Sequence, residues 1–127
     1  MKKLLVLLFS ILISFNSYGE WKQITVSLDG QHTHYVNVDT IKENNGYVYF
    51  WKLIDYLKRN EWGDMSIMIY LQGDCGVTRH KILTFLPYDQ PMGNGEFKQF
   101  DGDGKWDYLL PNSVSEEVLN FVCNYVN

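Results

Sequence analysis

The chain has 127 residues, with 15 acidic against 11 basic residues and a formal net charge of −4. This length is that of a single domain that can bury a real hydrophobic core. An acidic surface is repelled by nucleic-acid phosphates and by anionic lipid headgroups, so we exclude nucleic acid as a partner.

The first 19 residues have the layout of a secretory signal peptide. Two lysines precede an apolar run over residues 4–13, and the polar stretch that follows has small residues at Ser17 and Gly19. The apolar run is shorter than the roughly 20 residues of a membrane span. We therefore expect cleavage after Gly19 and one exported domain over residues 20–127, in the periplasm or on the outer cell surface. Loss of the two lysines lowers the net charge from −4 to −6.

Turn signals divide the rest of the chain into short segments rich in β-branched and aromatic residues, which is typical of antiparallel strands. We expect strands near residues 21–28, 34–41, 47–56, 65–72 and 77–86, with a less regular pair at 96–100 and 105–110. Asn45-Gly46 is the clearest turn, because a type I′ turn needs positive φ at two residues, and it should join 34–41 to 47–56. Pro87 to Gly95 carries two prolines and two glycines and is expected to be a loop.

The C-terminal segment predicts the one helix. Ser113-Val114-Ser115-Glu116 is a capping box, in which the serine caps the third free amide and the glutamate reaches back. An apolar stripe at helical spacing follows, made of Val118, Leu119, Val122, Cys123 and Val126. The expected fold is therefore α+β: a meandering antiparallel sheet of about six strands with a C-terminal helix across one face.

Two cysteines, Cys75 and Cys123, occur in the whole chain. An even pair in an exported protein predicts a disulfide, which would tie the helix to the turn beside Cys75. The alternative is a nucleophilic or redox cysteine. Asp74 argues against it, because a neighbouring carboxylate raises the pKa of a thiol.

Candidate metal sites are incomplete. His32 and His34 would face the same side of a strand, but His80 is the only other histidine to supply a third ligand, so we expect solvated histidines. Asp101 to Asp107 has acids at three places of a calcium loop, but Asn112 stands where the loop needs a glutamate, so we expect a hairpin turn. We expect no metal and no cofactor.

Catalytic patterns are missing from the sequence. No serine lies in a Gly-x-Ser-x-Gly elbow, and no Gly-x-Gly-x-x-Gly run follows a predicted strand. Carboxylates such as Asp55 and Asp89 show no pairing that would indicate acid and base roles. We assign no catalytic residue and expect no enzyme.

Aromatic residues gather in the segment 47–56. Strand alternation places Tyr47, Tyr49, Trp51 and Leu53 on one face and Val48, Phe50 and Ile54 on the other. Both faces are apolar, which is typical of a central core strand. Because one helix covers one face, a second interpretation is that the other face contacts a ligand or a second copy of the chain, through Trp51 with Tyr47 or Tyr49. The sequence leaves open which face the helix covers.

Several segments, taken in order, resemble the surface-adhesin E family of Gram-negative exported proteins. The resemblance runs from Trp21 to Cys123, and its most specific part is the loop Pro91-Met92-Gly93-Asn94-Gly95-Glu96. The other segments are Trp21-Lys22, Tyr35-Val36-Asn37-Val38-Asp39, the strand from Val48 to Tyr56, Asp74-Cys75, Trp106, and Pro111 with Ser113. The chain departs from the family pattern after Asp39, where a Pro-Ser step before Ile41 is missing, and over residues 76–81, which are less basic.

The resemblance implies a small antiparallel sheet with a C-terminal helix held by the cysteine pair, and a binding protein. The family name implies adhesion to host cells or extracellular-matrix proteins, so a host protein is the expected partner; a homodimer is the alternative assembly. The basic residues left in the 76–81 segment are Arg79, His80 and Lys81. The predicted binding residues are Tyr47, Tyr49, Trp51, Arg79 and Lys81. The alternative function is that of an envelope-associated structural protein of the periplasm without a host ligand.

Overall fold

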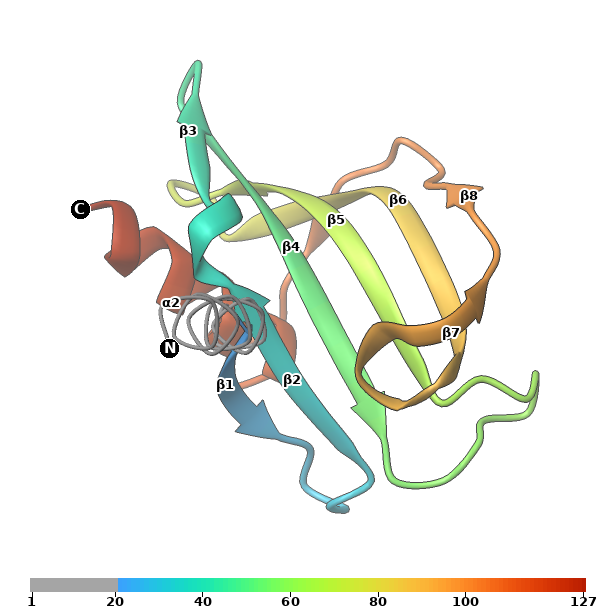
Figure 1. The fold of residues 1–127 in the computed structure, drawn as a ribbon. Coiled ribbons are helices and arrows are strands. Elements are labelled where there is room, and N and C mark those ends of the chain that lie inside the picture. Colours follow the sequence, from blue (N-terminus) through green and yellow to red (C-terminus); the bar gives the residue numbers. More distant parts are fainter. Residues whose placement is uncertain (1–20) are drawn as a thin grey trace, which may run out of the picture.

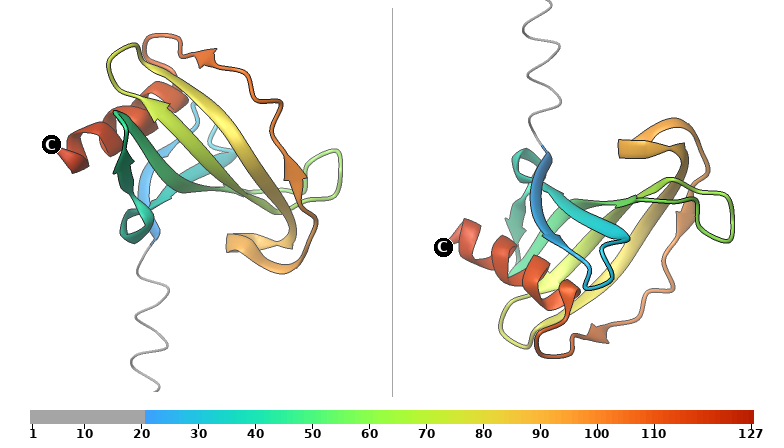
Figure 2. Two further views of the ribbon diagram at one scale, coloured as in Figure 1. Left: turned by 90° about the horizontal axis from the view of Figure 1, so that it is seen from above. Right: turned by 90° about the horizontal axis from the view of Figure 1, so that it is seen from below.

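The computed structural model describes residues 21–127, so the predicted signal peptide lies outside the described residues. Figure 1 shows an antiparallel sheet with a helix at one side, and the two further views in Figure 2 show how the sheet curves. The strands are β1 (Trp21–Val26), β2 (His32–Asn37), β3 (Lys42–Asn44), β4 (Tyr47–Tyr56), β5 (Ser66–Asp74), β6 (Arg79–Gln90), β7 (Asn94–Phe97), β8 (Phe100–Asp101) and β9 (Asp107–Tyr108). Two 3₁₀ turns, η2 (Val38–Thr40) and η3 (Pro91–Gly93), and the helix α2 (Val114–Val126) complete the described chain.

The strands form a nine-stranded sheet whose main path is β1-β2-β4-β5-β6-β7. Three short strands extend this path, because β3 pairs with β4 while β8 and β9 both pair with β6. Every pairing is antiparallel. The predicted α+β architecture is confirmed, with more strands than the six expected.

Helix α2 covers the sheet face that carries Val48 and Phe50, whose side chains are almost fully buried. The predicted stripe is the buried side of the helix, with Val118, Leu119 and Val122 at its centre. Gly73 in β5 lies beneath Leu119, where a Cβ atom would clash with the leucine side chain and with Val48. Glycine at this position therefore allows the close approach of helix and sheet.

The helix begins at the predicted cap. The Ser113 hydroxyl accepts the backbone N–H of Glu116 at 3.2 Å. The carboxylate of Glu116 accepts the N–H of Asn112 at 2.9 Å, one residue earlier than a standard capping box requires. Both interactions satisfy backbone amides at the start of the helix.

The predicted disulfide between Cys75 and Cys123 is confirmed. It closes 48 residues of chain and joins the β5–β6 turn to the last turns of α2. In the chain-entropy model a loop of this length stabilises the folded state by at most ~4 kcal/mol. The bond therefore reinforces the packing of the helix on the sheet.

The strand predicted over residues 34–41 is wrong in its extent. The Asn37 side chain accepts the N–H of Asp39 at 3.2 Å, and the Thr40 hydroxyl donates to the Asn37 carbonyl at 2.7 Å, which turns the chain into η2. Asn45 and Gly46 both have positive φ, as predicted, but their turn joins the short β3 to β4. Local side-chain hydrogen bonds after Asn37 therefore end β2 early.

Two expectations near the end of the sheet are also wrong. Residues 87–90 belong to β6. The Pro87 carbonyl accepts the N–H of Lys98, on the side of β6 away from β5. The N–H that proline lacks would point to that same side, so no hydrogen bond to β5 is lost. Residues 100–101 and 107–108 do not form a hairpin with each other, because each pairs separately with β6. The predicted hairpin turn at 101–107 is thus a connection that runs along the β6 edge.

Candidate functional site

The second face of β4, opposite to the helix, is covered over its lower half by η3. Leu53 is fully buried there. The carboxylate of Asp55 accepts the N–H of Met92 at 2.8 Å, and the Ser66 hydroxyl accepts the N–H of Gly93 at 2.8 Å. A Cβ atom on Gly93, which has positive φ, would clash with Met68. The Pro-Met-Gly loop is therefore held against this half of the sheet by the buried Ser66, the partly buried Asp55 and a required glycine.

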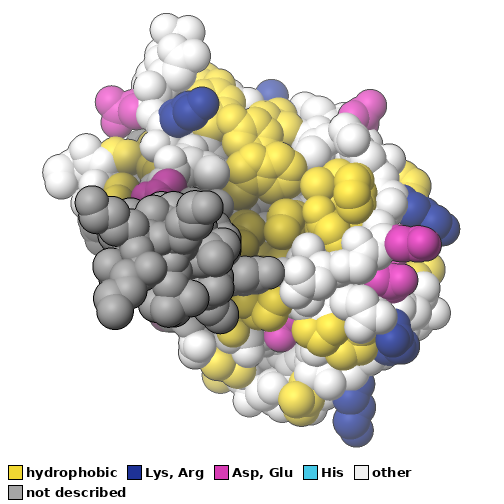
Figure 3. Space-filling view, in the orientation of Figure 1, with side chains coloured by type: hydrophobic (Ala, Val, Ile, Leu, Met, Phe, Trp, Pro, Cys, Tyr) yellow, Lys and Arg dark blue, Asp and Glu magenta, His cyan; other side chains and the backbone are white. Residues whose placement is uncertain are grey.

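The upper half of the same face is left open. It carries a set of rings that we call the aromatic face, namely Tyr47, Tyr49, Trp51, Tyr70 and Trp106. The ring centroids of Trp51 and Tyr70 lie 5.0 Å apart, and those of Tyr49 and Tyr70 lie 6.4 Å apart. Figure 3 shows hydrophobic side chains gathered over the upper parts of β4 and β5.

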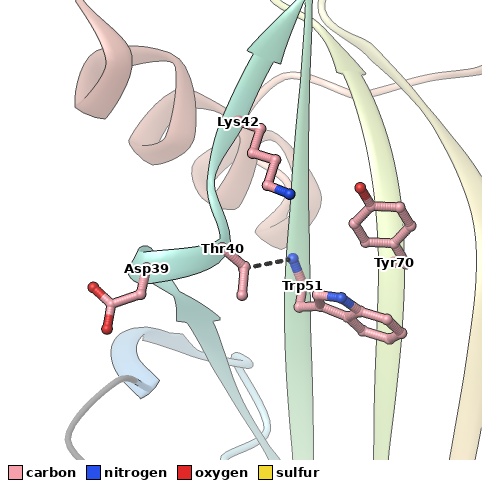
Figure 4. A pocket seen from close by; sticks show the side chains of 5 residues that line it. All are labelled: Asp39, Thr40, Lys42, Trp51 and Tyr70. Carbon is pink, nitrogen blue, oxygen red and sulfur yellow. Dashed lines mark hydrogen bonds between the residues drawn. The ribbon is translucent and has the colours of Figure 1, made fainter.

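A hollow of about 280 Å³ opens on the aromatic face. Its lining residues are Asp39, Thr40, Lys42, Trp51 and Tyr70. The backbone N–H of Trp51 donates to the Thr40 hydroxyl at 3.4 Å, so η2 forms one wall. Figure 4 shows the rings of Trp51 and Tyr70 side by side, Lys42 extending toward them from β3, and the carboxylate of Asp39 turned away.

A cationic cluster borders the aromatic face around Trp106. The guanidinium carbon of Arg79 lies 4.1 Å from the centre of the Trp106 ring, and the ammonium of Lys81 lies 4.6 Å from it. The ring of Tyr47 lies 5.4 Å from the same indole. Arg79 also forms an ion pair with Asp74 at 2.9 Å, and this carboxylate raises the pKa of the guanidinium above its usual value. These cation–π contacts fix the position of Trp106 on the sheet.

Strand register extends this surface across four strands. Lys42 in β3 lies opposite Tyr49 in β4. Tyr49 lies opposite Gln72 in β5, and Gln72 lies opposite Lys81 in β6. Cross-strand partners point to the same side of a sheet, so the row places one lysine at each end and an aromatic ring between them. The five predicted binding residues, from Tyr47 to Lys81, therefore lie on one face of the sheet.

Sequence reasoning missed three members of this surface: Lys42, Tyr70 and Trp106. Alternation within β5 groups Tyr70 with Gln72, but only the register with β4 places that group beside Trp51. No local pattern places Trp106, because it follows an irregular connection before β9. His80, which precedes Lys81, pairs with Gly73 and so belongs to the opposite, helix-covered face, where burial lowers its pKa.

The histidines considered as metal ligands lie elsewhere. His32 packs edge-on against Tyr56, with ring centroids 5.1 Å apart. His34 is buried, not solvated as expected, and burial, with a smaller contribution from Lys52, lowers its pKa to about 3. Within residues 21–127, no three side chains of His, Cys, Asp or Glu come together as metal ligands.

A buried lysine lies on the helix-covered face. Lys52 is 5% exposed, and burial lowers the pKa of its ammonium from 10.5 to about 8. In the part of the chain that the structure describes, the only ion pair within 4.0 Å is that of Arg79 with Asp74, so Lys52 has no carboxylate partner. Burial of this charge without a partner therefore lowers the free energy of unfolding of the protein.

The described helices include none with the length and hydropathy of a membrane span. The open face presents ring faces for stacking, ammonium and guanidinium charges, and hydrogen-bond donors.

The fold is similar to that of solved structures of Haemophilus influenzae protein E. One crystal form has a TM-score of 0.64 and 16% sequence identity, covering 83% of this chain and 90% of that chain. A second structure has a TM-score of 0.63 and 15% identity, covering 84% and 86%, respectively. A structure of protein E from a non-typeable strain has a TM-score of 0.55 and 15% identity, covering 82% and 77%. At these identities the likeness shows the fold.

A comparison of the sequence with curated proteins finds no match. The model of the family described as "Surface-adhesin protein E" matches residues 21–124, nearly all of the described chain. The chain belongs to the surface-adhesin protein E family.

Proposed function

We propose that this chain is an exported, non-enzymatic adhesin that uses the aromatic face to bind a protein of the host cell surface or extracellular matrix. The observation that carries the proposal is that the chain covers one face of its central strand with a helix but leaves Tyr49, Trp51 and Tyr70 partly exposed on the other. Membership of a surface-adhesin family supports both the export and the binding role.

The composition of the open face supports a protein contact. Aromatic residues and arginine are the side chains that most often dominate the energy of protein interfaces. Trp51 and Trp106 are fixed by ring contacts, and Arg79 is fixed by its ion pair with Asp74. Side chains that are already ordered lose little conformational entropy on binding, which favours affinity.

The test compares two tryptophans of the same chain. Trp51 lies in the aromatic face, whereas Trp62 is 76% exposed in the loop between β4 and β5. Trp51→Ala should lower binding of the purified protein to epithelial cells and to reconstituted extracellular matrix by roughly tenfold or more, and Trp62→Ala should leave it unchanged. Equal loss in both variants, or no loss in either, would contradict the proposal.

Two further measurements separate the remaining possibilities. Protease treatment of intact producing cells should degrade the protein, because an adhesin must reach the outer surface; full protection would favour a periplasmic structural role. Light scattering of the purified protein tests the homodimer. A dimer that dissociates in Trp51→Ala would assign the aromatic face to self-association and contradict the host-protein proposal.

A further inference from the structure

We propose that the chemical group recognised by the aromatic face is a sulfated, uronic-acid-containing sugar chain of the kind attached to surface and matrix proteins. This inference rests on the proposed function, because it names the ligand class for the same surface. Three observations carry it: the aromatic rings of the hollow, the excess of hydrogen-bond donors around them, and two lysines without a carboxylate partner at the ends of one cross-strand row.

The rings of the hollow are suited to a sugar. The ring centroids of Trp51 and Tyr70 lie 5.0 Å apart at an interplanar angle of 34°, so the two rings lean against each other, and both line the hollow. One side of a pyranose ring presents C–H groups, which pack on aromatic faces through dispersion and the ring quadrupole. A hollow of about 280 Å³ is at the small end of ligand sites and suits a single ring of a chain better than a folded protein element.

The polar groups of the hollow favour a ligand rich in acceptors. The Lys42 ammonium and the Trp51 indole N–H can only donate hydrogen bonds, and the Tyr70 hydroxyl can donate one. None of these three groups has a side-chain hydrogen-bond partner among residues 21–127. The one carboxylate of the lining, that of Asp39, is turned away from the rings (Figure 4). Sulfate and carboxylate oxygens would satisfy these donors, whereas an apolar side chain would leave them unpaired.

The spacing of the cations favours a chain with repeated charges. Lys42 and Lys81 stand at the two ends of the row through Tyr49 and Gln72, three strand spacings or roughly 14 Å apart. No carboxylate of residues 21–127 lies within 4.0 Å of either ammonium. Arg79 adds a third cation beside Trp106, partly neutralised by Asp74. A ligand that fits this surface carries several negative groups within this span and packs on the aromatic rings between the lysines. A densely sulfated sugar chain has both properties.

The net negative charge of the chain predicts that binding of an anionic ligand depends on salt concentration. The chain carries a net charge of −4, so an anionic ligand is attracted only where cations are concentrated. Binding through Lys42 and Lys81 should therefore weaken strongly as NaCl rises from about 0.05 M to about 0.5 M. Stacking on Trp51 and Tyr70 should persist at high salt.

The experiment measures the affinity of the full exported domain for a heparin hexasaccharide by titration calorimetry. A desulfated hexasaccharide that retains its uronic acids and a hexaglutamate peptide serve as matched probes. We expect the sulfated probe to bind and both matched probes to bind at least tenfold more weakly. Trp51→Ala should weaken binding roughly tenfold or more. The double variant Lys42→Ala with Lys81→Ala should do the same and flatten the salt dependence.

The control variants are Lys58→Ala and Trp62→Ala, which change exposed residues outside the aromatic face. Thermal unfolding and circular dichroism establish that each variant is folded. The inference is overturned if the sulfated hexasaccharide fails to bind, if either matched probe binds equally well, or if the control variants lose as much affinity as the face variants. Equal binding of hexaglutamate would assign the face to acidic peptide segments.

A competition experiment separates this inference from the proposed function. If Trp51→Ala loses matrix binding and the sulfated hexasaccharide competes with the parent protein, both stand. If Trp51→Ala loses matrix binding but the hexasaccharide does not compete, the aromatic face remains the adhesive surface and the sugar is wrong. If Trp51→Ala binds matrix normally, the proposed function fails, and the sugar proposal for the adhesive contact fails with it.

Discussion

The two faces of β4 differ in what covers them. On one face, Val48 and Phe50 are sealed by a 13-residue helix that a disulfide ties to the sheet. On the other, the three-residue η3 covers Leu53, and the rings above it stay partly exposed. A strand that is apolar on both sides therefore need not have both sides in the core.

The two faces of the sheet also differ in how their polar groups are used. On the second face, Asp55 and Ser66 hold η3 in place through backbone N–H groups. On the helix-covered face, Lys52 and His34 are buried, and the Nδ1 atom of His34 has no hydrogen-bond partner in the described chain. The helix-covered face thus buries polar groups that lack partners. On the other face, Asp55 and Ser66 have hydrogen-bond partners in η3, whereas the side-chain donors of the lysine, tryptophan and tyrosine that line the hollow have none among residues 21–127.

The largest expected effect comes from Phe50, at the centre of the helix-covered face. Phe50→Ala removes a side chain that is 1% exposed and should lower the free energy of unfolding by roughly 3–5 kcal/mol. Urea denaturation followed by tryptophan fluorescence measures the change. Tyr49→Ala, on the neighbouring position of the same strand, is the matched control and should lose much less. Equal losses would mean that both faces are core.

Removal of the disulfide should have the next largest effect. Cys75→Ala with Cys123→Ala should lower the free energy of unfolding by up to ~4 kcal/mol, because the loop of 48 residues is no longer closed in the unfolded chain. The aromatic face does not include either cysteine, so ligand affinity of the folded fraction should be retained. Peptide mapping of the unreduced parent should show the linked pair; two free thiols in freshly exported protein would contradict the bond.

Much of this contrast between the faces could be predicted from sequence because the signals are local. Alternation along residues 47–56 sorted Trp51 from Phe50, and the helical period from Val118 to Val126 defined the buried stripe. The pairing of Cys75 with Cys123 followed from count and compartment. The alternation and the helical period need only neighbours in the chain, and the cysteine pairing needs only a count of two in an exported protein.

The unpredicted features depend on partners distant in sequence. Which side of β4 the helix covers is decided by Leu119 packing over Gly73. Tyr70 joins the site through the register of β5 with β4, and Trp106 through contacts with Arg79 and Lys81 on β6. The covering role of Pro91–Gly93 depends on Asp55 and Ser66, whose carboxylate and hydroxyl have no sequence pattern that reveals their partners.

The buried lysine offers a test of opposite sign on the helix-covered face. The pKa of Lys52 is about 8 in the folded protein against 10.5 for an ordinary lysine, a difference equivalent to about 3 kcal/mol. Lys52→Met keeps the length of the side chain and removes the charge, so it should raise the free energy of unfolding at pH 7 by up to about 3 kcal/mol.

The pH dependence provides the control for this variant. Between about pH 8 and pH 10.5 the unfolded state binds more protons at Lys52 than the folded state does, so the parent protein gains stability as pH rises. The gain should be complete above about pH 10.5 and absent below about pH 8. Urea denaturation at pH 7 and pH 10.5 should show the difference between parent and Lys52→Met shrinking toward zero. A constant difference would show that Lys52 is not a buried charge.

The smallest expected effect is that of Trp51 on stability, and it defines the second face. Trp51→Ala removes the ring contact with Tyr70, and such aromatic pairs contribute about 0.5–1.5 kcal/mol beyond area burial. Because the Trp51 ring lines an open hollow and not the closed core, no enclosed cavity remains, and the free energy of unfolding should fall by about 1 kcal/mol. Trp62→Ala, in an exposed loop, should change it by less than about 0.5 kcal/mol. If Trp51→Ala instead destabilises the protein as much as Phe50→Ala, the ring belongs to the core, and the contact surface lies elsewhere on the molecule.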